Sequence, residues 1–278
     1  MHSRSQRALA LVGPGRAGTT LAAALVARGW ECVAVAGRSP GAPSTVRAAG
    51  LLAAPAVEVA EAGRDADLVL LATPDAAVAA AAATLAPGLR TGALVLHLSG
   101  ACTLAELDKL RTARPDVEIG SLHPLQALPS VEAGPGRLAG SWCAVAGPDE
   151  VERIGLSLGM RPFRVGDDAR VAYHAAATIA SNHLVALLGQ AARVARDAGV
   201  PPEALLPLAR ATLENVDDLG PAAALTGPVA RGDADTVARH LRAIAPEERS
   251  AYRALAREAL RLTGREDAAM LDAIGADP

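Results

Sequence analysis

A glycine-rich stretch near the start of the chain constrains the fold more than any other feature of the sequence. It reads LVGPGRAG over residues 11–18, with an apolar run at 8–12 before it and a helix-forming segment at 19–28 after it. A buried parallel strand requires such an apolar run, so the glycines are expected at a strand-to-helix turn. This context is typical of the first turn of a dinucleotide-binding βαβ unit.

The three glycines of this turn have different predicted roles. Gly13 permits the tight turn, Gly15 lets backbone approach a pyrophosphate, and Gly18 lets the helix pack closely on the strand. The helix N-terminus adds unpaired N–H groups and a partial positive charge, which suit a phosphate. A plain turn is the alternative, because glycines are common in loops. The predicted cofactor-binding residues here are Gly13, Pro14, Gly15, Arg16, Ala17 and Gly18.

The end of the next expected strand, at 31–36, indicates which dinucleotide binds. An NAD enzyme carries Asp or Glu about twenty residues beyond the glycines, where the carboxylate bonds the ribose 2′-hydroxyl. This chain has Arg38 and Ser39 there, and a guanidinium beside a hydroxyl pairs with a 2′-phosphate. The sequence therefore predicts NADP(H), with a merely solvated Arg38 as the alternative.

Composition excludes several classes of function. The chain has 278 residues, of which 51% are hydrophobic and 21% charged, which is typical of a globular protein. Its formal charge of −3 and its 2% of aromatic residues argue against a nucleic-acid partner and against an anionic membrane. The three cysteines lie far apart, and the six histidines lack metal-site spacing, so we expect no metal. No secretory segment is evident, and we expect a cytoplasmic protein.

Strands and helices alternate over the first 166 residues, and only helices are expected afterwards. This pattern predicts an α/β protein in which an N-terminal Rossmann domain, a doubly wound parallel sheet at 1–167, precedes an all-α domain at 168–278. The helical domain is expected to bind substrate and to form a homodimer. Further strands are expected at 67–72, 93–98, 117–122, 142–146 and 162–165, and the C-terminal helices at 169–198, 203–219, 233–243 and 247–262.

Polar residues follow three of the expected strands. Thr73 and Pro74 come after the third strand, Ser99 after the fourth, and His123 after a strand expected to end near residue 122. These turns should meet at the edge that carries the phosphate loop, close to a nicotinamide ring, where Thr73 and Pro74 are expected to contact the cofactor. His123 can pass a proton near neutral pH, and Ser99 can bond a substrate oxygen. A histidine bonded to backbone and an ordinary turn serine are the alternatives.

The helical half supplies further candidates. His174, Thr178 and Asn182 recur every four residues, so one helix face is expected to carry them along a cleft. Thr226 lies in a loop before a helix beginning at Asp233 and could grip a carboxylate or phosphate with the nearby N–H groups. Polar contacts between packed helices, or a helix break with Asp233 as the N-cap, are the alternatives.

Five motifs together resemble a known family. They are LVGPGRAGTTLA, LHLSGA, GSLHPLQALP, YHAAATIASNHLVAL and ALTGPVARGD, and they are similar to the Rossmann-like proteins that carry domain of unknown function 2520. That family looks related to the 6-phosphogluconate, ketopantoate, pyrroline-5-carboxylate and prephenate dehydrogenase or reductase superfamily. The resemblance implies an NADP-binding domain followed by a helical dimerising domain, and it spans nearly the whole chain.

The resemblance also implies roles for two residues and raises one difficulty. LHPL is similar to the HPM segment of prephenate dehydrogenases, which implies that His123 acts on the substrate, and LTGP is similar to a loop of pyrroline-5-carboxylate reductases, which implies a substrate role for Thr226. Many ketopantoate enzymes use a lysine four residues before an asparagine, whereas Thr178 holds that place here and Lys109 is the chain's only lysine. A lysine-based mechanism is thereby excluded.

These observations predict an NADPH-dependent reductase of a small 2-oxo acid that acts on a CH–OH or a CH–NH group. Ketopantoate is the first candidate for this small carboxylate substrate. The expected catalytic residues are His123, Asn182, Ser99, Thr226 and His174. A prephenate dehydrogenase-like oxidative decarboxylation and a non-catalytic NADP-binding regulator are the alternatives.

Overall fold

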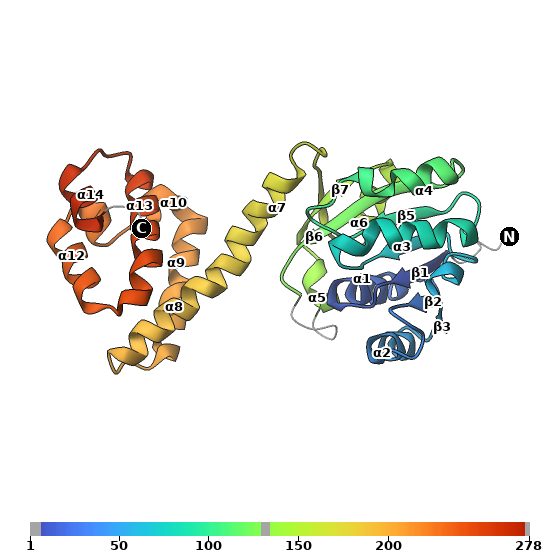
Figure 1. The fold of residues 1–278 in the computed structure, drawn as a ribbon, viewed down its shortest axis with the longest axis horizontal. Coiled ribbons are helices and arrows are strands. Elements are labelled where there is room, and N and C mark those ends of the chain that lie inside the picture. The colour runs from blue at the N-terminus through green and yellow to red at the C-terminus, as the bar shows by residue number, and fades with distance from the viewer. Residues whose placement is uncertain (1–6, 129–133, 276–278) are drawn as a thin grey trace. The chain divides into compact units, whose positions relative to one another are not determined.

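The chain divides into two compact units, Met1–Ser181 and Asn182–Pro278. A computed structural model describes residues 7–128 and 134–275, and each unit is treated by itself (Figure 1). The sequence predicts a domain boundary after residue 167, and this boundary stays a prediction. The division into compact units falls fourteen residues later, after Ser181.

The first unit is built on an eight-stranded sheet with the order β3-β2-β1-β4-β5-β6-β7-β8. The order β3-β2-β1-β4-β5-β6 is that of a doubly wound dinucleotide-binding fold, with its switch point between β1 and β4. The strands are β1 (Ala8–Val12), β2 (Glu31–Ala36), β3 (Ala56–Val57), β4 (Leu68–Leu71), β5 (Leu94–His97), β6 (Glu118–Leu125), β7 (Trp142–Ala146) and β8 (Arg161–Arg164).

Alternation of side chains along β1 explains why both faces of the sheet are covered. Leu9 and Leu11 belong to one buried cluster, whereas Ala10 and Val12 belong to another. Helices α1 (Arg16–Val26), α2 (Pro43–Leu51) and α6 (Asp149–Ser157) contribute to the first cluster. Helices α3 (Val78–Leu85) and α4 (Asp108–Ala113) contribute to the second. The predicted fold class, an α/β sheet followed by helices, is confirmed.

Strand direction departs from the sequence expectation at one place. β7 pairs antiparallel with β6, with His123 opposite Ala144, while β8 returns parallel to β7. An antiparallel pair needs no long crossover helix, and the described part of the β6–β7 connection contains only the short α5 (Gly134–Leu138). Apolar runs do not encode strand direction, so an all-parallel sheet was the wrong expectation at this edge.

Several element boundaries also differ. α1 begins at Arg16 and not at 19, because the helix starts directly after Gly15. β6 extends to Leu125, so His123 lies inside a strand and not in the turn after one. The helix α2, which the sequence analysis missed, starts with Pro43 at its first position, where proline needs no hydrogen-bonded N–H.

Every regular element among the described residues of the second unit is a helix. Val237, Leu260 and Met270 are among the residues of its core. Asp233 caps α12, because its side chain accepts a hydrogen bond from the Thr236 backbone N–H at 3.0 Å. The sequence analysis gave this N-cap as the alternative to a ligand-binding loop. The longer helices are α8 (Leu184–Asp197), α9 (Leu205–Leu219), α12 (Ala234–Ala243), α13 (Arg249–Thr263) and α14 (Ala268–Ile274), with short turns α10 (Pro221–Ala224) and α11 (Pro228–Arg231).

A long helical run joins the chain of the first unit to that of the second. It consists of α7 (Arg170–Thr178), a π-helical turn at Ile179–His183, and α8. By length and composition, Arg170–Asp197 meets the criteria for a membrane span, with a mean hydropathy of 1.2 over its best window. A single helix of this kind is weak evidence for a span.

Candidate functional site

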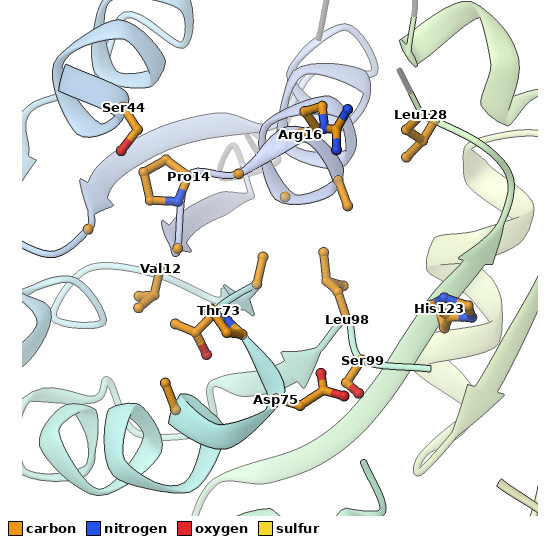
Figure 2. A pocket seen from close by; sticks show the side chains of 18 of the residues that line it. Val12, Pro14, Arg16, Ser44, Thr73, Asp75, Leu98, Ser99, His123 and Leu128 are labelled. Carbon is orange, nitrogen blue, oxygen red and sulfur yellow. The ribbon is translucent and has the colours of Figure 1, made fainter. Parts of the chain in front are cut away.

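A cavity of about 950 Å³ opens at the carboxyl ends of the central strands of the first unit (Figure 2). Ligands of doubly wound sheets bind at this edge, at the switch point, and the volume is within the range of small-molecule and cofactor sites. Most of the residues predicted for the site line this one cavity: Gly13, Pro14, Gly15, Arg16, Ala17, Gly18, Arg38, Thr73, Pro74, Ser99 and His123.

The three glycines of the first turn differ in the space around them. A Cβ atom at Gly13, whose φ is +88°, would lie 2.6 Å from the Ala72 carbonyl carbon, so the turn and the close approach both require glycine. A Cβ at Gly18 would lie 2.5 Å from that of Ala72. Around Gly15 nothing lies within 4 Å, so this position is open on the cavity side. The geometry fits the three predicted roles.

The beginning of α1 fits a phosphate as well. Gly15 is the N-cap and gives no side-chain hydrogen bond, so the first N–H groups of the helix have no capping side chain. The side chain of Arg16, the first helical residue, also lines the cavity. This end of the cavity therefore combines a helix N-terminus with a cation, which favours an anionic group.

The end of β2 supplies a second cation. Arg38 is exposed and lines the cavity, whereas Ser39, also exposed, does not belong to its lining. A different serine, Ser44 near the start of α2, takes part in the lining (Figure 2). The sequence analysis missed Ser44 because α2 was not predicted. A 2′-phosphate would thus have Arg38 and Ser44 within the same cavity wall.

The turns after β4 and β5 bring Asp75 and Ser99 together, with the Asp75 carboxylate directed toward Ser99 (Figure 2). Ser99 Oγ accepts hydrogen bonds from the backbone N–H groups of Ala101 at 3.1 Å and Cys102 at 2.9 Å. Those bonds occupy the acceptor side of this hydroxyl, so Ser99 can offer a ligand its O–H as a donor. Asp75 is the only carboxylate among the described residues of the cavity wall.

His123 lies at the far end of the cavity from the glycine turn, on β6 (Figure 2). Its Nδ1 is 2.7 Å from the Tyr173 hydroxyl, and its ring meets that of His174 edge-on, with centroids 5.9 Å apart. Gly100 makes this packing possible, since a Cβ there would lie 2.5 Å from His174 Cδ2 and 2.9 Å from His123 Nε2. His174 thus supports the ring of His123 within the first unit.

Burial lowers the pKa of His123 to about 4, and His174 and Arg170 lower it further, against an upward contribution from Asp75. The ring is therefore neutral at pH 7. A neutral imidazole has one N–H donor and one acceptor nitrogen, so its action on a ligand depends on which nitrogen carries the proton.

Two buried polar side chains lie behind this end of the cavity, and the sequence analysis did not single them out. Arg170, at the start of α7, is fully buried and donates a hydrogen bond to the Ser99 carbonyl at 3.2 Å, while its Nε and Nη1 have no partner in the described structure. Burial lowers the pKa of Arg170, with Asp167 opposing the change. This guanidinium fixes the loop that carries Ser99.

His97, the last residue of β5, is also fully buried, and neither of its ring nitrogens has a hydrogen-bond partner among the described residues. Burial lowers the pKa of His97 to about 4, and Arg170 lowers it further, while Asp75 opposes the change. A histidine inside the otherwise apolar strand ALVLHL was the signal that could have identified it.

Two of the predicted catalytic residues, Asn182 and Thr226, belong to the second unit, and both are exposed. Thr178 is the last residue of α7, and Asn182 lies within the π-helical turn at Ile179–His183, so the two are not joined by a regular α-helical turn. Hydrogen bonds in such a turn close over five residues. Thr226 precedes Gly227, whose φ of +93° starts the turn into α11. Their roles remain predictions.

No metal site appears in the part of the chain that the structure describes: it contains no group of three or more His, Cys, Asp or Glu side chains that could hold an ion. The three cysteines are free thiols.

Family models match both halves of the sequence. A Rossmann-like domain model matches residues 3–121, and the model of domain of unknown function 2520 matches residues 144–259. The chain belongs to the Rossmann-like proteins that carry domain of unknown function 2520. A comparison with curated proteins found no significant match to this DUF2520 protein.

Solved structures share the fold of the DUF2520 protein over most of its length. A candidate NADP oxidoreductase from Bacteroides fragilis matches with a TM-score of 0.78 and 25% identity, over 92% of this chain and 98% of that one. A Thermotoga maritima protein matches with a TM-score of 0.66 and 24% identity, over 92% and 100%. A reductive aminase from Aspergillus terreus, solved with NADPH and ethyl levulinate, gives 0.62 and 19%, over 96% and 99%. The last two likenesses, below 25% identity, show the fold alone.

Proposed function

We propose that this DUF2520 protein is an NADP(H)-dependent oxidoreductase that reduces a small 2-oxo acid, with ketopantoate as the first substrate to test. One observation carries the proposal: a single cavity runs from the open backbone at Gly15 to Ser99 and His123. If the phosphates of a dinucleotide bind at the glycine turn, its nicotinamide ring would lie near Ser99 and His123.

The residues present fit this cofactor. Gly15 leaves room for the pyrophosphate, and the N-terminus of α1 with Arg16 supplies positive charge. Arg38 would pair with the 2′-phosphate, where an NAD enzyme has a carboxylate. When bound, NADPH supplies a hydride. The candidate NADP oxidoreductase from Bacteroides fragilis supports this choice of cofactor.

The chain's own groups would bind and orient the carbonyl. Ser99 donates its O–H, because its oxygen already accepts two backbone N–H groups. His123 acts as a neutral ring and His174 holds that ring in place. The substrate roles of Asn182 and Thr226, which belong to the helical unit, are proposed from the sequence alone.

Cofactor binding tests the first half of the proposal. Gly15→Ala should lower the melting temperature only slightly, through the poorer N-cap, and should weaken NADPH binding measured by calorimetry, because the added methyl group enters space that the pyrophosphate would occupy. Gly41→Ala is the matched control, since its Cβ is equally free of contacts and lies outside the cavity lining. Wild-type affinity in Gly15→Ala would contradict the placement of the phosphates.

Turnover tests the second half. NADPH oxidation is measured with a panel of 2-oxo acids and cyclic imines, for the wild type and for His123→Ala. We expect a 2-oxo acid to be reduced and His123→Ala to lose most of kcat/KM with little change in NADPH affinity. Tight NADPH binding without turnover of any panel member would favour the alternative of a non-catalytic NADP-binding regulator.

Asp75 favours a second candidate, reduction of an imine. It is the cavity's one described carboxylate and points toward Ser99 (Figure 2), where a negative charge would attract a protonated imine and repel a substrate carboxylate. If imines are the substrates, Asp75→Asn should lower kcat/KM for imines and raise it for 2-oxo acids. An unchanged kcat/KM for imines in Asp75→Asn would contradict this second candidate.

We also propose a homodimer that forms through the helical unit. Exposed apolar side chains on α8 and α9 support it, since exposed apolar area of this kind is typical of association surfaces. Leu208→Lys should convert a dimer to a monomer in light scattering, whereas Leu51→Lys on α2 should not; a monomeric wild type would refute the proposal. The exposed residues are Val185, Leu187, Leu206, Leu208, Leu213 and Leu219.

A further inference from the structure

The hydrogen bond between Tyr173 and His123 determines more than the position of the ring. Tyr173 Oη and His123 Nδ1 lie 2.7 Å apart, a distance at which one of the two atoms donates to the other. The ring planes are nearly perpendicular, at 83°, with centroids 5.7 Å apart, so the hydroxyl meets the ring edge at Nδ1. The direction of this bond fixes which nitrogen of His123 carries the proton.

The protonation state of Tyr173 favours the hydroxyl as the donor in this pair. Burial raises the pKa of Tyr173 to about 12, so the hydroxyl keeps its proton at neutral pH and must direct it toward an acceptor. Within the described part of the chain, His123 Nδ1 is the acceptor at hydrogen-bond distance from this oxygen. If Nδ1 carried a hydrogen instead, the tyrosine proton would have no protein acceptor there.

The other ring nitrogen faces a different environment. A Cβ atom at Gly100 would lie 2.9 Å from Nε2, and both Gly100 and His123 line the cavity. Tyr173 and His174 from α7 contact the ring, and the charges of Arg170 from α7, Asp75 from the turn after β4 and His97 from β5 act on it. Arg170 and His174 disfavour a charged ring, and Asp75 alone favours one.

We propose that Tyr173 is a positioning residue that holds His123 in the tautomer with its proton on Nε2, so that the neutral ring presents an N–H donor to the cavity. This donor would bind a carbonyl oxygen of the substrate. The substrate part rests on the proposed reductase function, whereas the tautomer is a property of the free protein. Sequence reasoning could not reach it, because the two residues lie fifty positions apart.

The tautomer can be read directly from two-bond ¹H–¹⁵N correlation spectra of protein labelled at histidine, with His123→Gln to assign the signals. At pH 7 the wild type should show a protonated Nε2 and an unprotonated Nδ1 for His123. Tyr173→Phe should shift His123 toward a mixture of the two tautomers and should lower kcat/KM about tenfold, as expected for the loss of one hydrogen bond.

The chain contains a matched control pair. Tyr252 Oη lies 2.8 Å from His240 Nδ1 in the second unit, so Tyr252→Phe should change the signals of His240 and leave those of His123 and the activity unaltered. A proton on Nδ1 of His123 in the wild type, or an unchanged His123 spectrum in Tyr173→Phe, would overturn the proposal. The spectra need no substrate. Failure of the reductase assay would therefore contradict the proposed function, but it would leave the tautomer assignment unaffected.

Discussion

The first unit should lose stability in mild acid because it buries His97 as a neutral ring. The side chain is fully buried, its nitrogens have no described partner, and burial, reinforced by Arg170, lowers its pKa to about 4. In the unfolded chain the same ring has its ordinary value of 6.5. Between pH 6.5 and pH 4 the unfolded state binds a proton at this ring and the folded state does not. The unfolding free energy is therefore highest above pH 6.5 and decreases as the pH falls.

The size of the effect follows from those two values. A histidine with a pKa of 6.5 when unfolded and about 4 when folded costs roughly 2 kcal/mol of unfolding free energy between pH 8 and pH 5, and roughly 3 kcal/mol once the pH is below 4. His123 has a similarly lowered pKa but is only partly buried, so solvent reduces its contribution. His97→Leu removes the largest single contribution.

Urea unfolding at pH 8 and pH 5 measures the difference. The chain's two tryptophans, Trp30 and Trp142, both belong to the first unit, so fluorescence reports on that unit. His97→Leu should be at least as stable as the wild type at pH 8, because two unpaired polar atoms are removed, and it should lose roughly 2 kcal/mol less on going to pH 5. Equal losses in the two proteins would refute the reasoning.

Three further substitutions test the cavity. Gly100→Ala should separate the rings of His123 and His174, lowering kcat/KM in the NADPH assay while calorimetry shows unchanged cofactor affinity; unchanged kinetics would contradict the close packing. Arg38→Asp should reverse the preference for NADPH over NADH, and equal Kd values for the wild type and the variant would remove Arg38 from the 2′-phosphate site. Gly13→Ala should lower the unfolding free energy by roughly 2 kcal/mol or more in urea titrations, because it strains a φ of +88° and meets the Ala72 backbone, and a wild-type value would show that the loop can shift.

The sequence predicted the core of the fold because its signals are local. An apolar run, a glycine turn and a helix-forming segment are each contained within about twenty residues, so the first βαβ unit and its phosphate loop could be placed from the printed sequence. The same local logic identified Arg38 and the turns after β4 and β5, which the structure places around one cavity.

The parts that sequence reasoning missed depend on distant contacts. The antiparallel direction of β7 is set by pairing with β6, and no periodicity in Trp142–Ala146 encodes it. The position of His123 inside β6 follows from the same pairing, which carries the strand through Pro124 to Leu125. The π-helical turn at Ile179–His183 also lies within a continuous helical pattern, and its sequence gives no sign of the wider turn.

The end of the cavity near His123 shows the same limit. Tyr173 and Arg170 come from α7 to His123 and Ser99, across fifty and seventy-one residues of chain. A tyrosine or an arginine in a helix carries no sign of its distant partner. His97 was the exception, because a polar residue in an apolar strand is unusual and could have been examined on that ground.

The anchoring of Gly13 has a consequence for the kinetics of ligand capture. Its N–H donates to the Ala36 carbonyl of β2 at 2.9 Å, and its Cα lies against the backbone that follows β4, so two strands hold the loop from opposite sides. A loop held in this way needs no rearrangement to bind a diphosphate, and little conformational entropy is lost on binding. Association should then be limited by diffusion and orientation, and differences in affinity between related nucleotides should arise from how fast each one leaves.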